Sequence, residues 1–79
     1  MNKKVYEAVI GGKSDYNINY IDFQNLICAL GFEYKRHTGS HAMYYHRGIS
    51  EFVNIQKDGS KAKAYQVEQL RRIIKKHDL

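Results

Sequence analysis

The sequence predicts an α+β fold in which two helices pack on one face of a three-stranded antiparallel sheet, after a short N-terminal helix. Apolar residues recur with the period of a helix before Gly31 and again after Lys63, whereas the period changes to two between Phe32 and Ile55. The 79 residues contain no internal repeat, low-complexity tract or linker. We therefore expect residues 1–79 to form a single domain with one small core.

Local signals mark the ends of the predicted helices. The segment from Lys3 to Ile10 is followed by two glycines, a typical helix stop, so we favour a short helix there, although its residues also alternate as in a strand. Asn19, with Asp22 three positions later, resembles a capping box that opens the second helix, and Gly31 ends it. The last helix follows Lys63. The apolar faces of these two helices consist of Phe23, Leu26, Ile27 and Leu30, and of Val67, Leu70, Ile73 and Ile74.

Two turn segments, Thr38–Ser40 and Arg47–Ser50, divide the middle of the chain into a three-stranded meander. A two-residue turn at Gly39-Ser40 predicts the pairs Thr38–His41, His37–Ala42, Arg36–Met43 and Tyr34–Tyr45. A three-residue second turn, Gly48 to Ser50, predicts the pairs Val53–Tyr45, Ile55–Met43, Phe52–His46 and Lys57–His41. This register places the core on the face that carries Phe32, Tyr34, Met43 and Tyr45, with His41 at its margin.

Charge and cysteine content narrow the classes of function. Thirteen Lys and Arg residues outnumber eight Asp and Glu residues, and the net charge of +5 favours a polyanionic partner such as nucleic acid, or an acidic protein. The single Cys28 excludes an internal disulfide and a cysteine-based zinc site, and its helical spacing indicates a core position. No apolar run is long enough for a membrane span and the first residues lack the features of a signal peptide, so we expect a cytoplasmic protein with no membrane partner.

Several cationic groups are predicted to gather near His41 at one end of the sheet. The second helix should run back across the first strand, which brings its N-terminus to the Gly39-Ser40 end, and the last helix should begin at the same end. Helix N-termini carry unpaired amide donors and a partial positive charge, which favour anions. We therefore expect a site for RNA phosphates that consists of Arg36, Gly39, Ser40, Lys57, Lys61 and Lys63.

His41 is the candidate catalytic residue. Histidine titrates near neutral pH, so a neutral imidazole can accept a proton and return it. In RNA the nucleophile is built in, because His41 could deprotonate a 2′-hydroxyl while neighbouring cations stabilise the charge that grows on the phosphate. Such a reaction needs no metal or other cofactor. The competing interpretation is a hairpin histidine that only hydrogen-bonds the backbone.

The other candidate residues are weaker. The predicted register assigns His37 and His46 to the solvent-facing side of the sheet, His77 lies in a terminal turn, and the spacing of the histidines does not favour a metal site. Tyr44 is the best exposed candidate for stacking on a base, although packing is the simpler interpretation. The lysines at 61 and 63 would be equally ordinary in a solvated loop.

The stretch from Gly31 to His41, followed by Ala42-Met43-Tyr44-Tyr45, resembles the HicA (YcfA-like) family of bacterial toxins through its Gly-Phe, Arg and Gly-Ser-His order. The resemblance covers nearly the whole chain. Three further segments look like a longer subgroup of that family: Ser14–Ile18, Asn54–Gln56 and Lys61–Val67.

The resemblance implies a double-stranded-RNA-binding-domain-like fold and a small endoribonuclease that cuts messenger RNA. It also implies that the motif histidine, here His41, is catalytic, and that a HicB-type antitoxin protein keeps the toxin inactive. The sequence departs from the family pattern at Ala42, where many relatives have a second histidine, and at Lys57 and Ala64, where relatives often have proline. The first change removes an auxiliary proton donor, and the other two alter loop stiffness.

Three hypotheses follow. The leading one is a metal-independent ribonuclease of a toxin-antitoxin system that uses His41 as a general base. The main alternative is a non-catalytic RNA-binding module of the same fold, because double-stranded-RNA-binding domains generally bind without cutting. In the third, the basic face serves chiefly to dock an acidic regulator.

Overall fold

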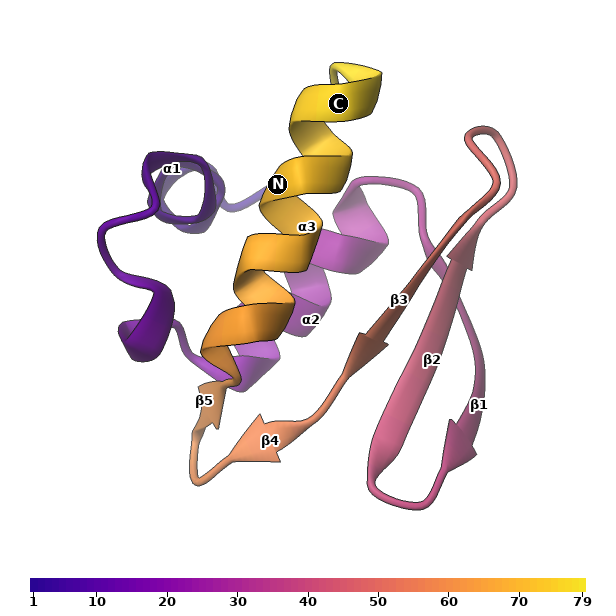
Figure 1. Cartoon of the computed structure of the whole chain (residues 1–79), viewed down its shortest axis with the longest axis horizontal. Coiled ribbons are helices and arrows are strands. Elements are labelled where there is room, and N and C mark those ends of the chain that lie inside the picture. The colour runs from indigo at the N-terminus through magenta and orange to yellow at the C-terminus, as the bar shows by residue number, and fades with distance from the viewer.

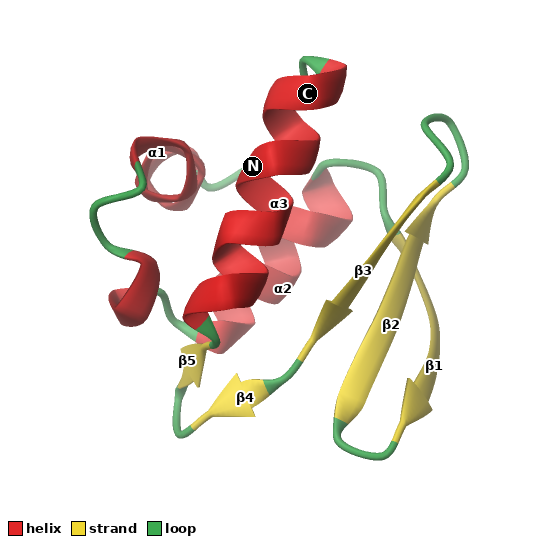
Figure 2. Cartoon of the chain, viewed as in Figure 1, coloured by secondary structure: helices red, strands yellow, loops and turns green.

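The computed structural model describes all 79 residues and has the predicted α+β architecture (Figures 1 and 2). Its elements are α1 (Lys3–Gly11), the 3-10 turn η1 (Asp15–Asn17), α2 (Tyr20–Ala29), β1 (Glu33–Thr38), β2 (His41–His46), β3 (Glu51–Ile55), β4 (Lys57–Asp58), β5 (Lys61–Ala62) and α3 (Ala64–His77). Strands β1, β2 and β3 form the main antiparallel sheet in that order, and β4 pairs with β5 in a separate hairpin. None of the helices combines the length and apolar character that a membrane span needs.

The helices begin and end where the local signals predict. The side chain of Asn2 accepts a hydrogen bond from the Val5 amide at α1, and that of Asn19 accepts one from the Asp22 amide at α2, at 3.2 and 3.0 Å. Gly31 follows α2 with a φ of 103°, a conformation that glycine adopts without strain. The apolar residues predicted for the two long helices are buried, with the exception of the half-buried Leu30.

An ion pair holds the N-terminal part of the chain against α3. The Arg71 guanidinium donates to both carboxylate oxygens of Asp15, at 2.9 and 3.0 Å, and to the Val9 carbonyl at 3.1 Å. The hydrogen bond to Asp15 raises the pKa of Arg71. The Tyr6 hydroxyl also donates to the Leu79 carbonyl at 3.0 Å. Polar contacts therefore attach α1 and η1 to α3 and to the C-terminal residue, which are distant in the sequence.

The first hairpin starts in the predicted register and then slips. Three pairs near its turn are those expected: Thr38–His41, His37–Ala42 and Arg36–Met43. A β-bulge follows between Tyr34 and Arg36. Tyr34 therefore pairs with Tyr44, and the predicted pairing with Tyr45 is wrong.

The second turn is one residue longer than predicted. His46 pairs with Glu51, so four residues, Arg47 to Ser50, form the turn, and Ser50 has a φ of 54°. Because side chains alternate along a strand, this one residue moves the apolar side chains of β3 onto the other face of β2. The predicted pairs Val53–Tyr45, Ile55–Met43, Phe52–His46 and Lys57–His41 are replaced by Val53–Tyr44, Ile55–Ala42, Phe52–Tyr45 and Lys57–Ala62.

Phe32, Val53 and Ile55 are buried in the core as predicted, but β2 turns its opposite face to that core, so Ala42 and Tyr44 are buried in place of Met43 and Tyr45. We call the face covered by α2 and α3 the inner face; its buried residues are Ala42, Tyr44, Val53 and Ile55. The opposite face, which we call the outer face, carries the residues that alternate with the inward-pointing ones along each strand. They are Arg36, Thr38, His41, Met43, Tyr45, Phe52 and Asn54. The Gln24 side chain of α2 donates to the Tyr44 hydroxyl at 2.7 Å, which fastens the helix to the inner face.

The β4-β5 hairpin gathers both long helices at one end of the fold. The Tyr20 amide donates to the Ser60 carbonyl at 2.9 Å, and the Ala62 amide donates to the Ile18 carbonyl at 2.8 Å. The N-termini of α2 and α3 therefore lie together, at the same end of the molecule as the β1–β2 turn (Figure 1). This direction of the two helices is the one that the sequence predicts.

Candidate functional site

His41 is the first residue of β2 and belongs to the outer face, where no helix covers it. Its side chain is half-buried among its strand neighbours. From the sequence it was expected on the core face, beside the two helix N-termini. That placement is wrong, because the bulge and the longer turn place the opposite face of β2 against the core.

A cross-strand hydrogen bond fixes the imidazole of His41. Its Nδ1 lies 2.9 Å from Oδ1 of Asn54 on β3. An amide oxygen only accepts hydrogen bonds, so Nδ1 carries a proton, and in the neutral imidazole the lone pair is then on Nε2. The hydrogen bond therefore fixes the orientation of the ring and selects one neutral tautomer.

Three other predicted site residues, together with a threonine, surround His41. Arg36 and Thr38 share the outer face with it, since each pairs with a β2 residue of that face. Gly39 and Ser40 form the turn just before His41, and the Ser40 hydroxyl accepts a hydrogen bond from the Gln56 side chain at 2.8 Å. That bond ties the turn to the end of β3.

Lys57 lies on the helix side of the sheet. With Ser40, it lines a cleft of about 680 Å³ between α2 and β1, and its ammonium group lies 5.5 Å from the centre of the Tyr20 ring. The inner-face residues Tyr34 and His37 line the same cleft, and the Tyr34 hydroxyl lies 2.6 Å from His37 Nδ1. Lys57 is therefore close to the Gly39-Ser40 turn but does not face His41.

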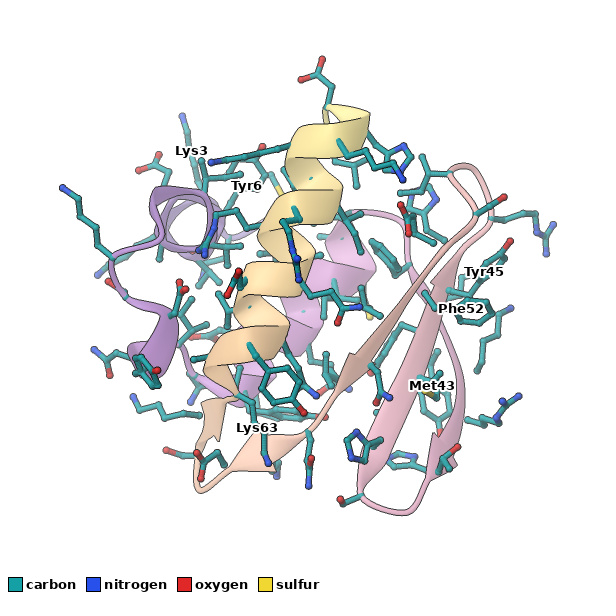
Figure 3. The ribbon with its side chains drawn as sticks, viewed as in Figure 1. Lys3, Tyr6, Met43, Tyr45, Phe52 and Lys63 are labelled. Carbon is teal, nitrogen blue, oxygen red and sulfur yellow. The ribbon has the colours of Figure 1, made fainter.

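Lys61 and Lys63 line a different, smaller cleft at the start of α3, of about 440 Å³. Figure 3 shows Lys63 beside the first turn of α3. Asp58, the β-sheet partner of Lys61, lines that cleft as well. The predicted phosphate site is thus distributed over the outer face, the turn and two clefts, and the structure does not bring all of its cations around His41.

The remaining histidines occupy three different environments. His37 is exposed, as predicted, but it belongs to the inner face at the rim of the cleft. His46 was predicted to face solvent and instead packs half-buried with its ring edge-on to Phe32, at 5.1 Å between ring centres. His77 Nε2 lies 2.7 Å from a carboxylate oxygen of Glu51. No group of three or more histidine, cysteine or acidic side chains is arranged to hold a metal ion.

Two further predictions about single residues are wrong. Cys28 is exposed rather than part of the core, and it lines the larger cleft. Tyr44 is buried, with 2% of its surface exposed, and burial raises its pKa. Because the exchange of faces turns Tyr44 inward, it is not free to stack on a base.

Asn54 and the pair Tyr45–Phe52 were missed from the sequence as members of the site. The length of the second turn decides where these residues lie. A four-residue turn places Asn54 diagonally across from His41 and Phe52 opposite Tyr45. The sequence contains that alternative register, but nothing local selects it over the three-residue turn.

Comparison of this chain with protein families, with curated proteins and with solved structures gives no match.

Proposed function

We propose that this protein is an endoribonuclease in which His41 is the general base, acting as the toxin of a toxin-antitoxin system. The observation that carries the proposal is the hydrogen bond between His41 Nδ1 and Asn54 Oδ1, which in the neutral imidazole leaves the lone pair on Nε2. The competing interpretation expects a hydrogen bond to the backbone, whereas the partner of His41 is the side chain of Asn54. The Gly-Ser-His motif shared with the HicA family supports the same residue from the sequence.

The proposed reaction uses the nucleophile that RNA supplies. Nε2 of His41 removes the proton of a 2′-hydroxyl, whose oxygen attacks the adjacent phosphorus while the bond to the 5′-oxygen breaks. The Arg36 guanidinium, on the same face, stabilises the negative charge that develops on the phosphate oxygens. The departing 5′-oxygen takes a proton from water and His41 later releases its proton to water, so the products are a 2′,3′-cyclic phosphate and a 5′-hydroxyl.

Asn54 is a positioning residue in this proposal. Because its amide oxygen accepts the Nδ1 proton, the neutral imidazole cannot present a protonated Nε2 to the substrate without losing the hydrogen bond. The same contact fixes the plane of the ring. Asn54 thus acts through His41 and needs no contact with RNA.

The test is cleavage of an end-labelled RNA by the purified chain in EDTA, beside DNA of the same sequence. Cleavage of RNA alone, leaving cyclic phosphate ends, is the expected result. RNA that is bound but stays intact would support the main alternative, a non-catalytic RNA-binding module. Cleavage of the DNA would contradict the proposed use of the 2′-hydroxyl.

We also propose an acidic, HicB-type antitoxin as the partner that silences the protein. The chain has a net charge of +5 and its candidate site is open to solvent, so an acidic protein should associate rapidly, and added salt should slow the association. The antitoxin should cover His41 and compete with RNA. Coexpression with the neighbouring gene should restore growth and yield a complex, whereas simultaneous binding of RNA at full affinity would show that the two partners use separate surfaces.

A further inference from the structure

Two aromatic side chains stand side by side on the outer face without any element to cover them. Phe52 leaves 55% of its surface exposed, although it lies within β3. Its cross-strand partner Tyr45 is half-buried, and the two ring centres lie 4.5 Å apart with an angle of 41° between the planes (Figure 3). The core lies on the other face, so this pair has no part in it.

The aromatic pair is continuous with the candidate catalytic group. Only Met43 separates His41 from Tyr45 on this face of β2, and Met43 pairs with Asn54, which holds the imidazole. Four residues of a strand span about 13 Å. A planar group stacked on Phe52 therefore lies near the position proposed for the reacting phosphate, but not at it.

The charges near the aromatic pair are compatible with a polyanion. Arg36, on the neighbouring strand, pairs with Met43 and so lies diagonally from both His41 and Tyr45. The carboxylate of Glu33, which pairs with Tyr45, lies 3.8 Å from the ammonium group of Lys35, so its charge is partly balanced. A cation next to an exposed aromatic ring is the combination with which proteins bind single-stranded nucleic acid, by holding the backbone and stacking the base.

Building on the proposed ribonuclease function, we propose that Phe52, supported by Tyr45, is a stacking site for an unpaired base that flanks the reacting phosphate. In a duplex both faces of each base are already stacked, so only a single-stranded nucleotide can offer its face to Phe52. The substrate is therefore single-stranded RNA, or an unpaired segment of a folded RNA. A paired segment gains nothing from the aromatic pair.

The test measures binding of a fluorescent, unstructured RNA and of its perfect duplex to the full chain with His41→Ala, which prevents turnover. Phe52→Leu should weaken binding of the single strand about 5- to 150-fold, the range that removal of one stacked base produces. The matched variant Phe52→Tyr keeps an aromatic ring and should bind nearly as tightly as the parent. Neither variant should change the affinity for the duplex or the salt dependence, because no charge is removed.

Equal binding of the single strand by Phe52→Leu and Phe52→Tyr would overturn the proposal, as would a duplex affinity with the same dependence on Phe52. So would unchanged RNA binding together with altered self-association in sedimentation, because the face would then be an interface between copies of the chain. Thermal unfolding checks each variant, and Tyr45→Leu provides the same readout if Phe52→Leu unfolds.

Cleavage assays separate this proposal from the ribonuclease proposal. If the chain with His41 intact cleaves RNA while Phe52→Leu binds and cleaves normally, the stacking site is wrong and the ribonuclease stands. If single-strand binding depends on Phe52 but no RNA is ever cleaved, the stacking site stands and the ribonuclease is wrong.

Discussion

The inner and outer faces of the sheet consist of alternate residues of the same strands, yet they differ in what their side chains do. The inner-face residues Ala42, Tyr44, Val53 and Ile55 are each at most 3% exposed and pack beneath the helices. On the outer face, His41 is held by a hydrogen bond and Phe52 is largely exposed. The two-residue period of a strand thus separates stability from the proposed chemistry, so each can be altered with little effect on the other.

The largest expected effect on stability comes from the inner face. Ile55→Ala should lower the free energy of unfolding by about 2 to 5 kcal/mol, because it removes buried methyl groups and leaves a cavity. For a domain of this size, each kcal/mol of destabilisation lowers the unfolding midpoint by about 4 to 8 °C. Calorimetry of Ile55→Ala and of the outer-face variant Met43→Ala measures the contribution of each face to stability. Equal destabilisation by the two substitutions would contradict the difference between the faces.

Removing the partner of His41 should reduce activity without unfolding the chain. Asn54→Leu removes the acceptor for Nδ1 and should cost a large part of the about 10²- to 10⁴-fold that general-base catalysis supplies. Asn54→Asp keeps an acceptor and adds a negative charge, which favours the imidazolium, so its pH–rate profile should shift to higher pH. Identical profiles for Asn54→Asp and the parent chain would show that Asn54 does not act through His41.

The helices could be predicted from sequence because their signals are local. Asn19 caps α2 through an amide three residues away, and the apolar stripe of α3 repeats within a single segment. The buried Phe32, Val53 and Ile55 could also be predicted, but the face of β2 could not, because it depends on the bulge before Arg36 and on a turn of four rather than three residues. A shift of one residue exchanges the faces, so the candidate His41 was placed on the wrong side of the sheet.

The candidate cations outside the outer face should contribute charge without selecting a sequence. Lys61→Gln with Lys63→Gln should weaken RNA binding and flatten the plot of log affinity against log salt by about 0.7 for each phosphate of the single strand that is no longer neutralised. Lys3→Gln with Lys75→Gln is the control, since it removes the same charge from exposed positions elsewhere. Equal slopes for the two double variants would show that the lysines at 61 and 63 are ordinary solvent-exposed residues that do not contact RNA phosphates.

The smallest expected effect concerns the hydrogen bond that ties the end of α3 to the start of β3. The hydrogen bond from His77, followed by the charge of Lys76, lowers the pKa of Glu51 below its usual 4.5. Because the folded chain favours the ionised carboxylate, its contacts stabilise the fold above about pH 4.5. That stabilisation disappears as the pH falls through the lowered pKa and the carboxylate is protonated. Glu51→Gln should therefore reduce the unfolding midpoint slightly at pH 7, and the difference from the parent chain should vanish in acid; a difference that persists at about pH 2 would contradict this explanation.

The central claim is that His41 supplies chemistry from a face that contributes little to folding. The most direct measurement is single-turnover cleavage of a labelled RNA by His41→Ala, with the thermal unfolding midpoint recorded on the same preparation. We predict a rate at least about 10²-fold lower, with a midpoint close to that of the parent chain. Cleavage at the parent rate, or a loss of activity that only accompanies unfolding, would contradict the claim.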